Sequence, residues 1–118
     1  MKYYSTNKKA PVVGLHEAVV KGLAADKGLY MPFSIQELPH SFYENIDRLS
    51  FQEIACKVAS AFFGEDIPEN VLNKIVCDTL NFDVPAVEVK ENIYSLELFH
   101  GPTLAFKDVG ARFMARLL

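Results

Sequence analysis

The chain has 118 residues, of which 50% are hydrophobic and 23% charged, a composition typical of one globular domain with a small core. Its net charge is −3 at pH 7, and acidic and basic residues are mixed along the chain, so neither nucleic acid nor an anionic membrane is an expected partner. No apolar run reaches the length of a membrane span and the first residues lack the apolar stretch of a signal peptide, so we expect a cytoplasmic protein.

The first part of the chain predicts short elements separated by turns. Its prolines and glycines mark the turns, and one apolar repeat at helical spacing begins at Leu15. In chain order, the predicted elements are a strand at residues 2–6, a loop at 7–14, a helix at 15–23, an extended segment at 29–31 that ends before Pro32, and one helical turn at 34–38 before Pro39.

Two amphipathic helices are predicted next. The first begins at Ser50, because Ser50 and Glu53 have the spacing of a capping box, and it ends at Gly64. The second has Pro68 at its first position and continues to Leu80. The loop between them is short, so the helices should pack as a hairpin through their apolar stripes, which are Phe51, Ile54, Ala55, Val58 and Phe62 in the first and Val71, Leu72, Ile75, Val76 and Leu80 in the second.

After residue 81 the apolar spacing changes from helical to alternating, which predicts strands at 86–90 and 92–99 and then a helix at 108–118. The predicted fold class is α/β, with a helix-rich front half followed by two strands and a helix. We expect an N-terminal domain at 1–82 and the beginning of a second domain at 83–118. The last helix has no stop signal and is too short to be stable alone, so we expect the chain to be part of a longer protein.

Cysteines and histidines are few. Cys56 and Cys77 both fall in predicted helices, and two cysteines without a secretory signal do not indicate a disulfide scaffold, so we expect both as buried thiols. The three histidines are scattered and do not match metal-ligand spacing with the cysteines. We therefore predict no metal site.

Lys107 is the candidate catalytic residue. A lysine that forms an imine must attack as the neutral amine, which apolar surroundings and a nearby positive potential both favour. Phe99, Leu104 and Phe106 are apolar neighbours in sequence, and the predicted helix at 108–118 would direct the positive end of its dipole toward Lys107. Asp108 favours the ammonium instead, but it is also a good N-cap for that helix. Residue type alone leaves an exposed surface lysine as the simpler interpretation.

The segment Leu96–Leu117, which contains His-Gly-Pro-Thr-Leu-Ala-Phe-Lys-Asp, resembles the lysine segment of threonine synthases of the bacterial and fungal type. The first six residues resemble their opening strand. The segments Glu17–Ala24, Gly28–Pro32 and Ser50–Ala55 also match in order and spacing, so the resemblance covers nearly the whole chain. Two departures, at Ala25 and Lys27 where the family often has Pro and Gly, affect a turn and leave the chemistry unchanged.

The resemblance implies a fold type II, tryptophan-synthase-like enzyme that holds pyridoxal 5'-phosphate through Lys107. Family members convert O-phospho-L-homoserine and water into L-threonine and phosphate, the last step of threonine biosynthesis, and their lysine also moves protons on the substrate. Thr103 and Asp108 are the further candidate cofactor-binding residues, Asp108 as support for the lysine. His100 is a weaker candidate in the same loop. Arg112 and Arg116 would attract a substrate phosphate or form a solvated helix face.

The family's cofactor-phosphate site is a Gly/Ser/Thr-rich loop that follows further along its chains, and no such loop occurs in these 118 residues. We therefore expect this chain alone to be inactive and to need the remainder of its own chain as a partner. Two alternatives stay open: another fold type II pyridoxal-phosphate lyase or dehydratase, and a non-catalytic module for protein contacts. The His-Gly-Pro-Thr run before Lys107 argues against the first.

Overall fold

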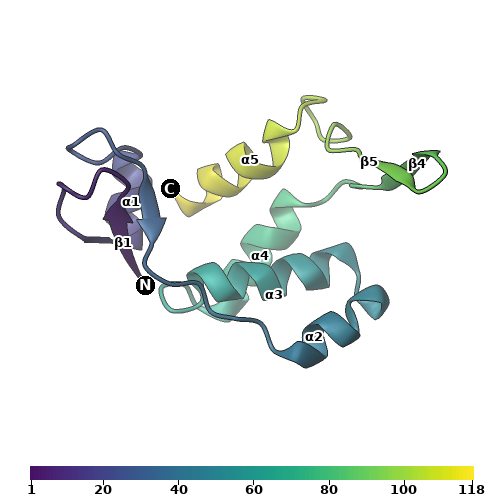
Figure 1. The fold of residues 1–118 in the computed structure, drawn as a ribbon, viewed down its shortest axis with the longest axis horizontal. Helices are drawn as coiled ribbons and strands as arrows, with labels where there is room; N and C mark the ends of the chain where they lie inside the picture. Colours follow the sequence, from purple (N-terminus) through teal and green to yellow (C-terminus); the bar gives the residue numbers. More distant parts are fainter.

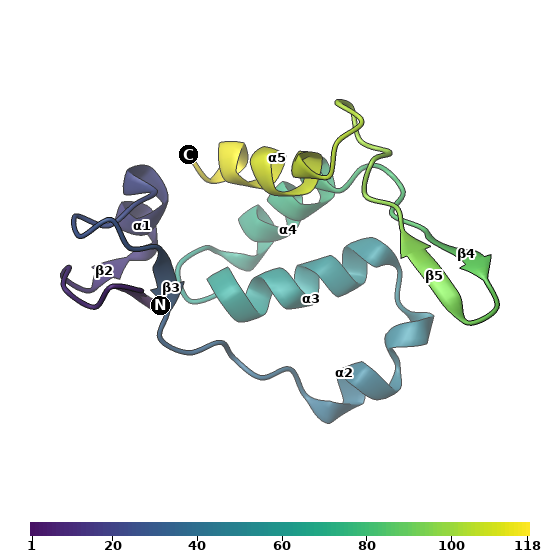
Figure 2. The ribbon, with the colours of Figure 1, turned by 45° about the horizontal axis from the view of Figure 1, so that its top comes forward.

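A computed structural model describes all residues 1–118 and confirms the predicted α/β fold class. A small sheet and the first helix form one end of the molecule, the other four α-helices follow, and a two-stranded hairpin projects at the other end (Figure 1). The view in Figure 2 shows the same order, with the C-terminus close to the first helix.

The N-terminal sheet has three antiparallel strands, β1 (Lys2–Ser5), β2 (Val13–Gly14) and β3 (Tyr30–Pro32), in the order β2-β1-β3. The strand predicted at 2–6 is found as β1, and the extended segment predicted at 29–31 is found as β3, which includes Pro32 instead of stopping before it. β2 lies inside the predicted loop, because a two-residue strand depends on pairing with β1 and leaves no pattern of its own. Pro32 lies in β3, an edge strand, where a missing N–H is tolerated.

The helix predicted at 15–23 is found as α1 (Leu15–Lys21), which directly follows β2 and covers the sheet. Their common core consists of Tyr3, Val13, Leu15 and Ala18, with Val19, Phe63 and Ile67 packed against it. The sheet is therefore joined to the middle of the molecule through the side chains of Phe63 and Ile67.

The predicted helical turn at 34–38 is wrong. Residues 34–39 have no regular structure, and the helix α2 (His40–Glu44) begins after Pro39, followed by a 3-10 turn at Ile46–Arg48. The residue before a proline is driven away from helical dihedrals by the proline ring. Leu38 is therefore unfavourable in a helix, and Pro39 is instead the N-cap of α2.

The helical hairpin is confirmed as α3 (Phe51–Phe63) and α4 (Glu69–Thr79). The capping box forms: the Glu53 carboxylate accepts from the Ser50 N–H at 2.7 Å, and the Glu53 N–H donates to the Ser50 hydroxyl at 3.3 Å. Pro68 is the N-cap, one residue outside the helix it was predicted to open. The shared core consists of Ala59, Leu72, Val76 and Leu80.

The buried faces of α3 and α4 differ in part from the predicted stripes. Phe51 and Val58 are 39% and 38% exposed, and Val71 is 44% exposed, whereas Ala59 and Ala61 are buried. Ala59 lies in the contact between the two helices, where a small side chain lets them approach closely, whereas Ala61 faces the side of α3 that is turned toward α2.

The strands β4 (Ala86–Lys90) and β5 (Ile93–Leu96) pair antiparallel through a turn at Asn92, whose φ is 61°. β5 is shorter than predicted, and every residue of both strands is exposed. The alternation of Tyr94 and Leu96 with polar residues therefore does not correspond to a buried face in this chain.

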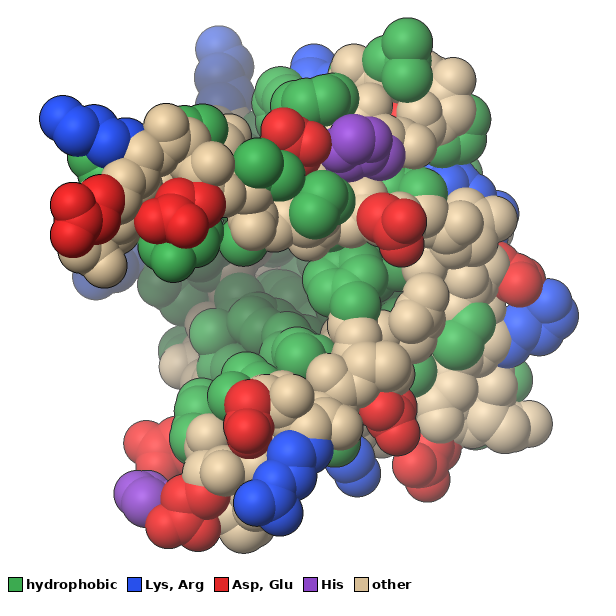
Figure 3. All heavy atoms as spheres, turned by 90° about the vertical axis from the view of Figure 1, so that its right-hand side faces the viewer, with side chains coloured by type: hydrophobic (Ala, Val, Ile, Leu, Met, Phe, Trp, Pro, Cys, Tyr) green, Lys and Arg blue, Asp and Glu red, His purple; other side chains and the backbone are tan.

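The molecule exposes more surface than a compact chain of its size. Its accessible area is 8353 Å², against about 6,400 Å² expected for 13.2 kDa. Its radius of gyration is 16.3 Å, against roughly 13.5 Å expected. Figure 3 shows hydrophobic side chains gathered in a hollow between the β4–β5 hairpin and α2. No helix combines the length and the apolar character needed to cross a membrane.

Candidate functional site

The candidate site lies where the loop after β5 meets the last helix, α5 (Lys107–Leu117). The loop turns at Gly101, whose carbonyl accepts a hydrogen bond from the Leu104 N–H at 3.0 Å. Leu104 has a φ of 57°, the left-handed region that an L side chain adopts at a cost. This turn brings Thr103 next to the first turn of α5.

Asp108 is the buried anchor of this loop, with only 4% of its surface exposed. Its carboxylate accepts hydrogen bonds from the Thr103 N–H and from the Thr103 hydroxyl, each at 2.8 Å. Burial acts to raise the pKa of Asp108, but the Thr103 donors, with smaller contributions from the Ala105 backbone and Arg112, outweigh it, so the net pKa is lowered. Asp108 is therefore a carboxylate at neutral pH.

The prediction that Asp108 is the N-cap is wrong. The N-cap is Phe106, which makes no side-chain cap, and Asp108 is the second residue of α5. Its carboxylate is turned back to the loop at Thr103 instead of to the amides of its own helix. An anion in the first turn still interacts favourably with the helix dipole, so Asp108 stabilises both the loop and the start of α5.

Gly101 is a part of the site that the sequence analysis did not single out. A Cβ added there would lie 2.5 Å from the Asp108 Oδ2, 2.7 Å from its Cβ and 2.9 Å from its Cγ. Real side chains do not approach this closely, so the position requires glycine. A Gly-Pro pair is typical of a turn, but the contact of Gly101 with Asp108 depends on the path of the loop between them.

Lys107 is the first residue of α5, and its side chain is exposed. It has no hydrogen bond or ion pair, since the neighbouring carboxylate of Asp108 is engaged by Thr103. The apolar enclosure predicted from its sequence neighbours is absent in this chain: Leu104 is 75%, Phe106 65% and Phe99 50% exposed. The structure thus presents a lysine without a protein partner on a well-anchored first helical turn.

Arg112 has a structural role that the sequence did not indicate. Its guanidinium donates to the Asn81 side-chain oxygen at 3.0 Å and to the Asp78 carbonyl at 2.9 Å, and it lies 5.6 Å from the centre of the Phe82 ring. It therefore joins α5 to the C-terminal end of α4. Arg112 is therefore not part of a solvated helix face, because its guanidinium donates hydrogen bonds to residues at the end of α4.

The remaining candidates have local partners. Arg116 donates to the Arg112 carbonyl at 3.0 Å, one turn back on α5. The His100 ring is 2.6 Å from the Glu97 carboxylate. The prediction of two buried thiols is wrong, because Cys56 is half-buried and Cys77 is exposed; on an amphipathic helix a cysteine at the edge of the apolar stripe remains accessible.

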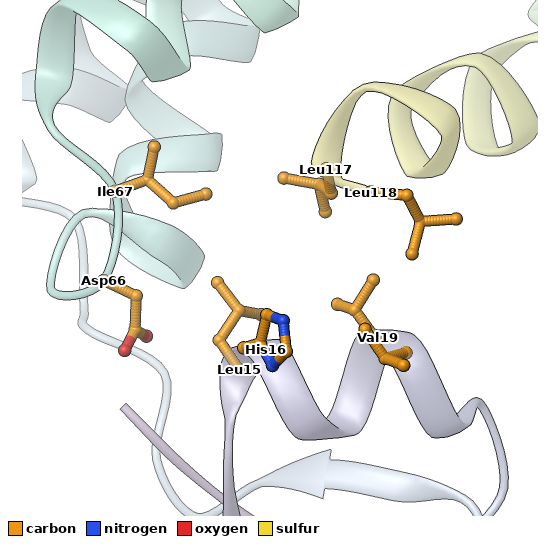
Figure 4. A pocket seen from close by; sticks show the side chains of 8 residues that line it. Leu15, His16, Val19, Asp66, Ile67, Leu117 and Leu118 are labelled. Atoms are coloured by element: carbon orange, nitrogen blue, oxygen red, sulfur yellow. The ribbon is translucent and has the colours of Figure 1, made fainter.

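A pocket of about 280 Å³ lies at the opposite end of α5 from Lys107. Figure 4 shows Leu117 and Leu118 on one side of it, facing Leu15 and Val19 of α1. Its lining is mainly apolar, and α5 separates it from Lys107 by roughly 15 Å of helix. This pocket is therefore distinct from the candidate site.

Comparisons with known proteins identify the family. Residues 2–80, more than half of the chain, match the family model described as threonine synthase N terminus. Threonine synthase from Escherichia coli (strain K12) is 38% identical over 118 residues, which cover 100% of this chain and 28% of that protein.

Solved structures agree with the family match. The crystal structure of threonine synthase from Escherichia coli aligns with a TM-score of 0.92 at 38% identity, over 100% of this chain and 28% of that one. The structure of PLP-bound threonine synthase from Brucella melitensis aligns with a TM-score of 0.91 at 38% identity, over 99% and 26%. The chain thus spans about 28% of the length of the E. coli relative. The fold and resemblance predicted from the sequence are confirmed, and the chain belongs to the threonine synthase family, whose N-terminal model it matches at residues 2–80.

Proposed function

We propose that the protein carrying this chain is a pyridoxal-phosphate-dependent threonine synthase, which converts O-phospho-L-homoserine and water to L-threonine and phosphate. The observation that carries the proposal is the first turn of α5. There Lys107 has no protein partner while its neighbour Asp108 is held by two hydrogen bonds from Thr103. This arrangement lies in a chain that aligns over its whole length with threonine synthase at 38% identity.

The residues present fit the cofactor. The Lys107 amine makes no ion pair with a carboxylate of the chain, and we propose it as the residue that binds the cofactor. Bound pyridoxal phosphate supplies an electron sink for the substrate carbon that loses a proton. The Lys107 amine would hold the cofactor and would also be the chain's own group for accepting and returning a substrate proton.

Thr103 and Asp108 hold Lys107 in place under this proposal. The two bonds between them fix the loop against the first turn of α5, and the lysine backbone lies between the two residues that make the contact. Both therefore belong to the cofactor-binding segment. An amine held on a rigid turn reacts with less loss of entropy than one on a mobile loop.

We also propose that residues 83–118 begin the catalytic domain and that this chain alone does not turn over substrate. The exposed positions of Leu104 and Phe106 support this, because a site that stabilises developing charge must exclude water around the lysine. In the whole protein, further segments of the same chain would cover these side chains.

The test is borohydride reduction of the full-length protein loaded with pyridoxal phosphate, followed by peptide mapping. We expect one stable adduct, on Lys107, and its loss in Lys107→Ala. Lys90→Ala, an exposed lysine of β4, is the matched control and should keep the adduct. An adduct on another lysine would overturn the site. Formation of keto acid and ammonia instead of threonine and phosphate would overturn the reaction while leaving the lysine assignment intact.

A further inference from the structure

A polar groove of about 300 Å³ follows the α3–α4 hairpin and contains both cysteines of the chain. Its walls are two stripes at intervals of one helical turn, Gln52, Cys56 and Ser60 from α3 and Glu69, Asn73 and Cys77 from α4. Neither thiol belongs to the proposed cofactor site, so the pair is independent of the proposed function.

The register of the hairpin places the two cysteines at the same level. The Gln52 side-chain amide donates to the Leu80 carbonyl at 2.9 Å, which fixes the start of α3 against the end of α4. Cys56 is four residues after Gln52, and Cys77 is three residues before Leu80. Because the helices are antiparallel, both steps lead one turn inward along the hairpin, to facing positions.

The two thiols differ in accessibility, and they lie close enough for Cys77 to affect the pKa of Cys56. Cys77 is exposed, whereas Cys56 is half-buried beside the Leu72 and Val76 core. The pKa of Cys56 is raised, first by burial and then by the nearby Cys77 thiol, with Lys57 opposing. An exposed thiol reacts first with an oxidant, and a half-buried partner next to it is placed to complete the exchange.

We propose that Cys56 and Cys77 are a dithiol–disulfide pair, which a low-molecular-weight disulfide oxidises to an intramolecular bond across the α3–α4 hairpin. The Cys77 thiolate attacks the reagent disulfide, forms a mixed disulfide and releases one reagent thiol. The Cys56 thiolate then attacks the Cys77 sulfur and releases the second reagent thiol. Two electrons pass from the protein to the reagent, and both protein protons leave with the two reagent thiols or to solvent.

The test is oxidation of the full-length protein with oxidised glutathione, followed by alkylation of free thiols and tryptic mapping without reduction. We expect peptide 49–57, which contains Cys56, to be joined to peptide 75–90, which contains Cys77. The joined mass should be two hydrogens less than the sum of the two peptides. Dithiothreitol should return both peptides to the free form.

Two variants and one condition separate the proposed steps. Cys56→Ser should stop at a lasting glutathione adduct on Cys77, and Cys77→Ser should leave Cys56 free and slow to alkylate. Folded protein should form the link faster than protein unfolded in urea. A glutathione adduct that persists on Cys77 of the unmutated protein would overturn the proposal, as would links only between copies or equal rates in urea.

Discussion

The contact between Gly101 and Asp108 makes Gly101→Ala the most informative substitution near Lys107. The new methyl group would lie within 2.9 Å of three atoms of Asp108, the nearest being Oδ2 at 2.5 Å. Asp108 cannot move away freely, because Thr103 holds both of its carboxylate oxygens at 2.8 Å. Either the backbone shifts or these hydrogen bonds break.

The expected cost follows from this geometry. Inserting a methyl group into a filled site costs about 1–3 kcal/mol, and we expect roughly 2 kcal/mol or more here because the obstructing side chain is fixed on both oxygens. With a urea m-value of about 1–1.5 kcal/mol/M for a domain of this size, a loss of about 2 kcal/mol should lower the unfolding midpoint by roughly 1.3–2 M.

Urea unfolding followed by circular dichroism measures this shift, and Gly110→Ala is the matched control. A Cβ at Gly110, in the middle of α5, meets no atom within 4 Å. Alanine favours a helix over glycine by about 1 kcal/mol, so Gly110→Ala should raise the midpoint. We therefore expect the unfolding midpoint to fall for Gly101→Ala and to rise for Gly110→Ala. A Gly101→Ala midpoint within about 0.3 M of the unmutated chain would refute the reasoning.

Three further predictions concern the N-terminal half. Lys27 has a φ of 67° and an exposed side chain. Replacing it with glycine should relieve a left-handed strain of about 1–2 kcal/mol, against which the greater freedom of unfolded glycine costs about 0.5–1 kcal/mol. Lys27→Gly should therefore stabilise the chain by about 0.5–1 kcal/mol in the same urea assay, and a loss of stability would contradict this. The pKa of Asp26 is lowered from 3.8 to about 2, chiefly by the hydrogen bond from the Ser5 hydroxyl and further by backbone donors, while burial acts to raise it. The unfolded carboxyl takes up its proton at a higher pH than the folded one. The contribution of Asp26 to stability is therefore complete above its ordinary pKa and disappears as the pH falls toward 2. Thermal melts from pH 5 to 2 should show that loss, and Asp26→Asn should flatten it. Ser50→Ala removes the capping box and should cost about 1 kcal/mol, whereas Ser60→Ala, at an exposed α3 position without a side-chain hydrogen bond, should not destabilise.

The elements that the sequence predicted well are those whose signals are local. The Ser50–Glu53 capping box and the Gly64 stop define α3 within a few neighbouring residues, and both are found in the structure. The same holds for β1 and α1. These features depend on short-range hydrogen bonds and apolar spacing, which the sequence displays directly.

Features that depend on distant partners were missed or misread. Arg112 was assigned to solvent or substrate because nothing near it in sequence indicates the Asp78 carbonyl, 34 residues earlier. Asp108 was assigned as an N-cap because the fold of the preceding loop, which delivers Thr103, has no local signature. Residues 34–38 differ for a local reason, since a single helical turn is marginal by itself and its last residue, before Pro39, disfavours helical dihedrals.

The hydrogen bonds of Arg112 to Asn81 and Asp78 also affect which parts of the chain unfold locally in the same event. α5 packs mainly on α4, and Arg112 bonds the end of α4 directly, so amides at the end of α4 and the start of α5 should exchange with deuterium in one shared opening event. A ligand that binds only the closed form at Lys107 would then slow exchange at residues 76–80, which it never contacts. Hydrogen exchange in α4 would thus report occupancy at the lysine.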